Sequence, residues 1–154
     1  MATKVKKGFI TTPSGDERSI QTIHGALLCE ETIVLTGSDS QNIDFQQYDS
    51  IEEAGDVFRK LVNALSQGEV VKGNRFIELP NGNLLRKEQI MAIELITNAY
   101  EGFILRNRKD QIVDFVAESD VGKREIIKAE LLKSLEEKTG RAKGYQPEWK
   151  TLLG

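Results

Sequence analysis

The chain repeats itself along its length, and this repetition constrains its fold more than any other feature. Shifting the sequence by 67 positions aligns identical residues, which pair as Phe9 with Phe76, Ile10 with Ile77, Pro13 with Pro80, Gly15 with Gly82, Ile23 with Ile90 and Leu28 with Leu95. Past a short insertion near residues 98–102 the offset becomes 70, and it pairs Leu35 with Leu105, Asp44 with Asp114, Phe45 with Phe115, Leu61 with Leu131 and Leu65 with Leu135. The identities include both turn and core positions, and they continue on both sides of one insertion. They indicate that the chain contains two copies of one sequence unit.

Each copy is expected to contain four strands followed by one helix. The strands of the second copy are predicted at 75–79, 88–96, 102–106 and 112–117. Between the first two lie Asn81 and Gly82, a strong hairpin signal because both residue types tolerate positive φ. The first copy has matching segments at 8–12, 32–36 and 42–47.

Both copies end in an amphipathic helix. The first opens at Ser50, and the Ser-x-x-Glu spacing to Glu53 lets the hydroxyl and the carboxylate each satisfy a free amide at the helix start. Its apolar residues recur at steps of three and four until Gly68, as expected for one buried face. The second helix is predicted over about residues 121–138 with a stop at Gly140, and its apolar face is formed by Val121, Ile127, Leu131, Leu132 and Leu135.

The fold class that follows is α+β, with two tandem ββββα repeats whose antiparallel sheets are packed by helices and related by a pseudo-two-fold axis. We place the first repeat at 1–68, the second at 69–139 and a C-terminal tail at 140–154. A chain of 154 residues is long enough for two such units to join as one compact domain, since domains commonly run to ~100–150 residues.

Strand alternation predicts which faces are buried. With a five-residue loop after Arg106, Phe103 and Leu105 face the same side as Val113 and Phe115, which places Phe45 and Phe115 in equivalent core sites. The opposite face is half apolar and needs cover from the other copy or from a second chain. The C-terminal tail offers apolar surface as well, and it either packs across its own sheet or docks onto a neighbouring chain. The predicted interface residues are Ile104, Ile112, Val116, Tyr145, Trp149, Leu152 and Leu153.

Basic residues gather in the second copy at positions where the first copy has acidic or neutral ones. They are Arg86, Lys87, Arg106, Arg108, Lys109, Lys123 and Arg124. If the sheet brings them together they form an anion-binding patch, to which the free amides at the start of the second helix would add. The alternative is structural, because Arg106 can pair with Asp114 on the same face and hairpin tips are often charged for solubility.

Composition and motifs argue against several other functions. A net charge of -3 and a pI near 5.3 give no general attraction to nucleic acid or to an anionic membrane surface. The start of the chain lacks the apolar region of a signal peptide and no segment is apolar enough to span a bilayer, so we expect a cytoplasmic protein without membrane contact.

No residue pattern predicts catalysis. The single histidine, His24, has no second histidine or cysteine at the spacing of a zinc site. The carboxylate pairs Glu30-Glu31 and Glu52-Glu53 fall where solvated charge is expected, and the glycines form no phosphate-binding loop. We therefore expect no catalytic residue, no metal, no cofactor and no enzymatic activity.

The first copy resembles a known family. The order of "FITTPSG", "TIVLT" and "SIEEA" within residues 8–65 is similar to the small FlbD-type flagellar-operon proteins, a resemblance of turn and core positions that carries over no functional residue. Tandem copies of four strands and a helix also resemble the architecture of PUR and whirly-type binders of single-stranded nucleic acid, although architecture alone does not imply function.

The function predicted from the sequence is that of a non-enzymatic binding or regulatory protein that self-associates, as a dimer or a larger homo-oligomer, through a sheet face and the C-terminal tail. The alternative is a binder of an anionic ligand, either a nucleotide or single-stranded nucleic acid, through the basic residues of the second copy.

Overall fold

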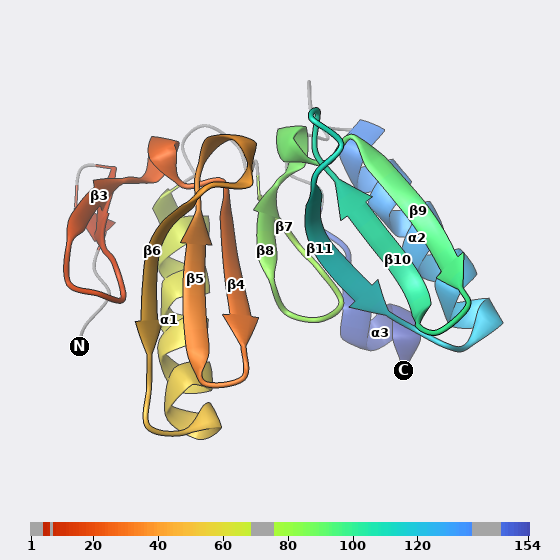
Figure 1. Cartoon of the computed structure of the whole chain (residues 1–154), viewed down its shortest axis with the longest axis horizontal. Coiled ribbons are helices and arrows are strands. Elements are labelled where there is room, and N and C mark those ends of the chain that lie inside the picture. Colours follow the sequence, from red (N-terminus) through yellow and green to blue (C-terminus); the bar gives the residue numbers. More distant parts are fainter. Residues whose placement is uncertain (1–4, 7, 69–75, 137–145) are drawn as a thin grey trace. The chain divides into compact units, whose positions relative to one another are not determined.

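The computed structural model describes residues 5–6, 8–68, 76–136 and 146–154. The chain divides into two compact units, Met1–Gly73 and Asn74–Gly154. Each unit combines antiparallel strands with helices (Figure 1). The α+β class is therefore confirmed, and the border between the units lies close to the predicted end of the first copy.

The first unit contains a small sheet and a longer meander. Its elements are β1 (Val5–Lys6), β2 (Phe9–Thr11), β3 (Glu17–Ser19), a 3-10 turn (Ile20–Thr22), β4 (Gly25–Cys29), β5 (Thr32–Thr36), a second 3-10 turn (Ser38–Ser40), β6 (Asn42–Gln47) and α1 (Ile51–Gly68). The strands β1, β2 and β3 form one antiparallel sheet, while β5 pairs with both β4 and β6.

The second unit repeats the order of strands from β2 to β6 and the helix that follows, without the second 3-10 turn and with a C-terminal helix added. Its elements are β7 (Phe76–Glu78), β8 (Leu84–Arg86), a 3-10 turn (Lys87–Gln89), β9 (Ala92–Thr97), β10 (Glu101–Arg106), β11 (Ile112–Ala117), α2 (Val121–Glu136) and α3 (Trp149–Leu153). The segment predicted as one strand over 88–96 begins inside the 3-10 turn, where the amide of Ile90 donates to the carbonyl of Lys87 at 3.2 Å. Each unit thus has a short extra strand, β3 or β8, that closes the first hairpin.

The two units share their strand register. Pairs in the first hairpin such as Phe9 with Ser19 reappear as Phe76 with Arg86, shifted by 67. Turn hydrogen bonds follow the same shift, because the amide of Gly15 donates to Thr12 and that of Gly82 to Leu79, both at the third residue back. Residues that the sequence alignment pairs therefore also have matching backbone partners in the two units.

A β-bulge in the last strand of each unit corrects the predicted faces. Leu105 lies opposite Asp114, but Arg106 lies opposite Ile112, so Val113 is an extra residue that shifts the alternation by one. The first unit has the same irregularity between Leu35 and Thr36. A bulge of this kind turns every later side chain of the strand to the other face.

The prediction that Phe45 and Phe115 occupy core sites is therefore wrong. Phe45 lies opposite Val34 and is 65% exposed. Phe115 lies opposite Ile104 on the face away from the core and packs edge-on against Tyr100, with ring centroids 6.4 Å apart. Val116, predicted for the open face, lies opposite Phe103 and is only 1% exposed.

Helix α1 covers the core face of the first meander. Its residues Ala54, Leu61 and Leu65 are fully buried, and α1 contacts β4 and β5, whose pair Ala26 and Leu35 is buried too. The predicted cap is present, since the amide of Glu53 donates to Ser50 Oγ at 3.0 Å. The Glu53 carboxylate accepts from the amide of Asp49, at 3.3 Å, rather than from Ser50.

Helix α2 lies behind β9 and β10 in Figure 1 and buries a narrower face than predicted. Ile127 and Leu131 are fully buried. Val121 and Leu132 were predicted on the same face, but they are 64% and 42% exposed. The helix therefore leaves apolar side chains in solvent beside the sheet.

Gly102, at the start of β10, provides a test of the packing between β10 and β11. Its φ of +151° is a conformation that other residues rarely adopt, and a Cβ there would overlap the carbonyl oxygen of Val116 and lie 2.9 Å from Cα of Ala117. We expect Gly102→Ala to lower the free energy of unfolding by about 1–3 kcal/mol, measured by urea denaturation. Gly55→Ala in α1 is the matched control, because its nearest neighbour, Arg59 Nη1, is 3.8 Å away. Equal stabilities for the two variants would contradict this account.

Candidate functional site

A carboxylate on the last strand of each unit binds the turn of that unit's first hairpin. Asp114 Oδ2 accepts from Asn83 Nδ2 at 2.9 Å and from Asn81 Nδ2 at 3.1 Å. In the first unit Asp44 accepts from the hydroxyl and the amide of Ser14, with the amide at 3.3 Å. These side chains bind one another, so this polar cluster holds the hairpin to the meander.

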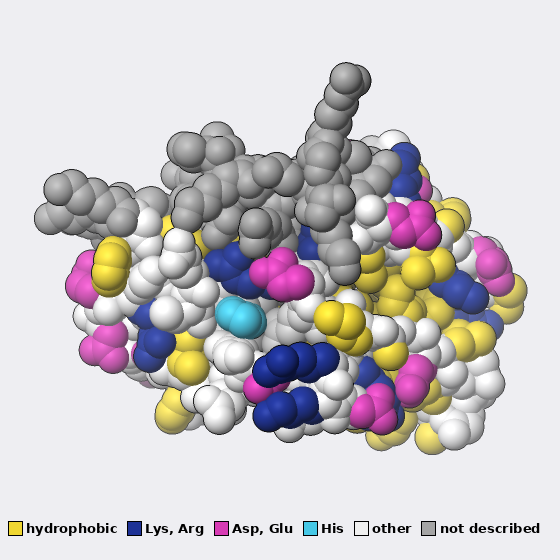
Figure 2. All heavy atoms as spheres, turned by 90° about the horizontal axis from the view of Figure 1, so that it is seen from above, with side chains coloured by type: hydrophobic (Ala, Val, Ile, Leu, Met, Phe, Trp, Pro, Cys, Tyr) yellow, Lys and Arg dark blue, Asp and Glu magenta, His cyan; other side chains and the backbone are white. Residues whose placement is uncertain are grey.

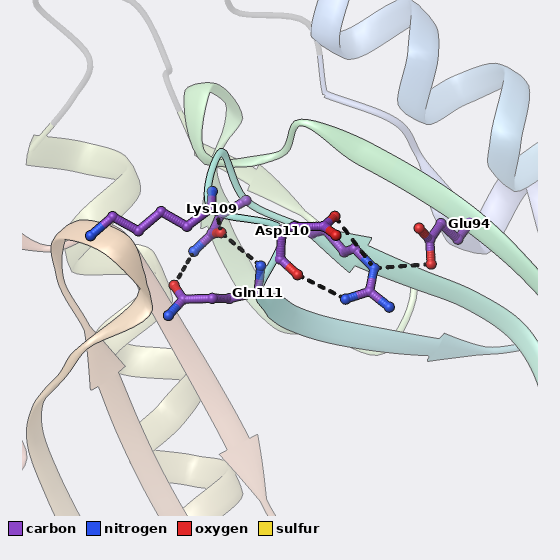
Figure 3. Close-up of polar contacts among 6 residues, drawn as sticks. Glu94, Lys109, Asp110 and Gln111 are labelled. Carbon is purple, nitrogen blue, oxygen red and sulfur yellow. Dashed lines mark hydrogen bonds and ion pairs between the residues drawn. The ribbon is translucent and has the colours of Figure 1, made fainter.

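The bulge also changes the partner of Arg106. The predicted pair of Arg106 with Asp114 is wrong, because Asp114 points to the hairpin turn. Arg106 Nε instead lies 3.0 Å from Glu94 Oε1 across the β9–β10 ladder, and Nη1 donates to the carbonyl of Asp110 at 2.8 Å (Figure 3). The hydrogen bond to Glu94 is the main reason that the pKa of Arg106 is raised.

The tip between β10 and β11 is closed by its own hydrogen bonds. Asn107 Oδ1 accepts from the amides of Lys109 and Gln111 at 2.9 and 3.0 Å, and Asn107 Nδ2 donates to Gln111 Oε1 at 2.9 Å. The side chain of Lys109 extends away from this network in Figure 3. These two amides of the tip are therefore engaged within the loop and are not directed at a ligand.

The predicted basic residues occupy different environments. Arg86 is 5% exposed with its guanidinium carbon 4.6 Å from the centroid of the Phe76 ring, and Lys87 is 1% exposed. Arg124 Nη1 lies 3.4 Å from Glu101 Oε2. Arg108, Lys109 and Lys123 are exposed. On the face drawn in Figure 2, basic side chains of the described residues are interspersed with acidic and apolar ones, and they form no continuous basic surface there.

The start of α2 is occupied by a side chain of the protein itself. Asp120 Oδ2 accepts from the amide of Lys123 at 2.8 Å, and the Asp120 carbonyl accepts from the amide of Arg124 at 2.9 Å. Asp is a preferred residue for capping a helix in this way. A phosphate at this position would have to displace the Asp120 carboxylate.

The C-terminal tail packs within its own unit, against the edge of β7. Gln146 bridges two backbone groups of this strand, donating to the carbonyl of Phe76 and accepting from the amide of Glu78 at 3.4 Å. Trp149 Nε1 donates to the carbonyl of Glu78 at 2.7 Å. Trp149, Leu152 and Leu153 are half-buried, and Tyr145 lies outside the described residues. The tail thus covers a strand edge that would otherwise be open.

A small pocket with both apolar and charged lining residues lies between α2 and the meander of the second unit. Its volume is about 110 Å³, and its lining residues are Ile93, Leu95, Phe103, Val121, Arg124, Glu125 and Lys128. Leu95 and Val121 are 57% and 64% exposed, and Met91 before β9 is 57% exposed. The sequence interpretation missed this surface because a continuous strand over 88–96 gave no sign that β9 forms the edge of its sheet.

Other titratable groups show no converging arrangement. Burial raises the pKa of the Tyr48 phenol, and the carboxylates of Glu53 and Asp44 raise it further. The Tyr48 hydroxyl is buried and has no hydrogen-bond partner in the part of the chain that the structure describes. Within that part, no group of three or more His, Cys, Asp or Glu side chains could hold a metal ion. None of the described helices is long and apolar enough to cross a membrane.

Comparisons of the chain with protein families, with curated proteins and with solved structures find no match.

The carboxylate anchor can be tested by Asp114→Ala. The substitution removes an acceptor that Asn81 and Asn83 share, so we expect the free energy of unfolding to fall by about 1–3 kcal/mol, measured by urea denaturation. Asp110→Asn is the control, because Asp110 is exposed at the tip, its carboxylate lies 3.8 Å from Arg106 Nε, and Asn tolerates the φ of +63° at this position. An Asp114 variant no less stable than the Asp110 variant would show that the turn does not depend on this carboxylate.

The Glu78 carboxyl on β7 is expected to make the stability of the protein depend on pH. Partial loss of hydration raises the pKa of Glu78, and the nearby Glu148 carboxylate raises it further. A carboxyl whose pKa is raised by folding stabilises the folded state when protonated, and this contribution is lost as pH rises through the folded pKa. We therefore expect Glu78→Gln to raise the Tm at neutral pH, with a gain that vanishes below the ordinary pKa of 4.5. Glu125→Gln is the control, and it should leave the Tm unchanged because Glu125 is exposed on α2. A gain in Tm for Glu78→Gln that persists in acid would refute the electrostatic cause.

Proposed function

We propose that this protein is a non-enzymatic binding or regulatory protein that self-associates through its second unit. The observation that carries the proposal is the exposed apolar surface of that unit. Five of its large apolar side chains are at least 56% exposed, namely Met91, Leu95, Tyr100, Ile112 and Val121. Two of them, Leu95 and Val121, line the same pocket, and exposed apolar surface of this kind is typical of an interface with another protein.

The surface differs from the one expected from the sequence. Val116 is buried, but the bulge places Phe115 on the open sheet face opposite the half-buried Ile104, so this face remains partly apolar. Trp149 donates a hydrogen bond to β7 and is half-buried within its own unit. Support for self-association therefore comes less from the tail than from the exposed apolar side chains of the meander and of α2.

Binding of a nucleotide or of single-stranded nucleic acid is the alternative proposal, and it has less support. Such a site needs cations that converge on one place. Arg106 and Arg124 are paired with carboxylates of their own unit, and Arg86 is buried beside Phe76.

The proposal includes a duplication of one ββββα ancestor. Its support is the identity of register in the two units, including the bulge at Leu35 and Leu105 and the turn anchors at Asp44 and Asp114. Under this proposal the second unit kept the framework of the first and acquired its exposed apolar side chains separately. The resemblance of residues 8–65 to FlbD-type proteins remains a prediction from the sequence.

Sedimentation velocity of the full chain tests self-association. Over micromolar to tens of micromolar concentrations we expect a species heavier than the 17.3 kDa of one chain. Because the proposed interface is apolar, its population should change little as salt rises, whereas binding that neutralises phosphates would weaken steeply. A monomer at every concentration would refute the proposal.

A further inference from the structure

Three strand edges of the second unit differ in how their backbone groups are covered. The outer edge of β7 is covered by Gln146 and Trp149, which bond to its carbonyls and to one amide. On β11, the carbonyl of Phe115 accepts from Asn81 Nδ2 at 3.2 Å. The third edge belongs to β9, which ends the order β11-β10-β9 and pairs on its outer side with no strand of the described chain.

The β9 edge also lacks the features that usually prevent edge pairing. Natural edge strands are protected by prolines, by lysines or by very short length. The sequence of β9 is AIELIT over six residues, with Glu94 as its only charged residue. The charge of Glu94 is engaged, because its carboxylate lies 3.0 Å from Arg106 Nε. The strand β9 therefore presents no lysine and no proline to an approaching strand, and its one carboxylate is already paired with Arg106.

Apolar side chains lie next to this open edge. Leu95 lies opposite Phe103, on the side of the sheet where α2 and the pocket are found. Leu95 is 57% exposed and Val121, at the start of α2, is 64% exposed. A strand added to β9 would cover both its backbone groups and these side chains, which is how β-strand addition combines affinity with specificity.

The strand that fits this edge best is a second copy of β9. A two-fold axis perpendicular to the sheet pairs two β9 strands antiparallel and keeps both α2 helices on one face. Only two such registers pair nearly the whole strand, one centred on Glu94 and the other on Leu95. The first places two carboxylates directly opposite each other, which is destabilising. The second places Leu95 against Leu95 of the partner subunit, and Glu94 against Ile96 of the partner subunit.

We propose that two copies of this chain pair edge to edge through β9, in antiparallel register centred on Leu95. The inference rests on the proposed self-association and specifies its surface, its symmetry and its register. The pairing joins two three-stranded meanders into one continuous sheet. It also joins the exposed Leu95 and Val121 side chains of both copies into one apolar strip, in the isologous arrangement that is commonest for homodimers.

A charge-exchange experiment on the full chain tests the register. Leu95→Glu and Leu95→Lys each place like charges directly opposite each other at the two-fold axis, so each variant is expected to lose the dimer seen for the unmodified chain by sedimentation velocity. An equimolar mixture places Glu against Lys, and the dimer is expected to return. Circular dichroism should show both variants folded, because Leu95 is 57% exposed.

Ile112→Lys is the matched control, because Ile112 is 56% exposed at the start of β11, on the opposite side of the same meander. This variant is expected to remain dimeric. Loss of the dimer only in Ile112→Lys would place the interface on the open sheet face and overturn the β9 proposal, while self-association would stand. Folded Leu95 variants that remain dimeric, or a mixture that stays monomeric, would also overturn it. An unmodified chain that is monomeric throughout would refute both proposals.

Discussion

One extra residue in the last strand of each meander determines how each unit holds together. The bulge at Val113 turns Asp114 toward the hairpin turn and Phe115 toward solvent, and the irregularity at Leu35 does the same for Asp44 and Phe45. Without it the carboxylates would lie on the open face and the first hairpins would lose their anchor. A bulge is thus a positioning device here, since it re-aims one side chain at the cost of one interrupted ladder pair.

Much of this fold could be predicted because its signals are local. Gly82 in a tight turn and the Ser50 to Glu53 spacing indicate a hairpin and a helix start wherever they occur. The bulge could not be predicted, because strand alternation assumes a period of two and a single added residue leaves no mark in composition. This is why Val113 and Leu105 were placed correctly in the core, whereas Phe115 and Val116 were exchanged between faces.

The partners of the candidate site residues could not be predicted from the sequence either. Charge density drew attention to the tip between β10 and β11, but the partners of its side chains depend on neighbours across strands. Glu94 is 12 residues from Arg106 in sequence and lies 3.0 Å from it in space, and nothing in the sequence near Arg106 indicates this. The open β9 edge was missed because an apolar strand residue such as Leu95 is assigned to the core as long as the strand order is unknown.

The attachment of Gln146 and Trp149 to β7 has a consequence for the order in which the protein can form during synthesis. In the first unit, Ser14 and Asp44 are only 30 residues apart, so the hairpin anchor can form while later residues are still being added. The partners of the β7 edge lie 68 to 71 residues downstream of it. Until those residues are synthesised, the outer edge of β7 lacks these partners, and an unpaired strand edge favours association with neighbouring chains.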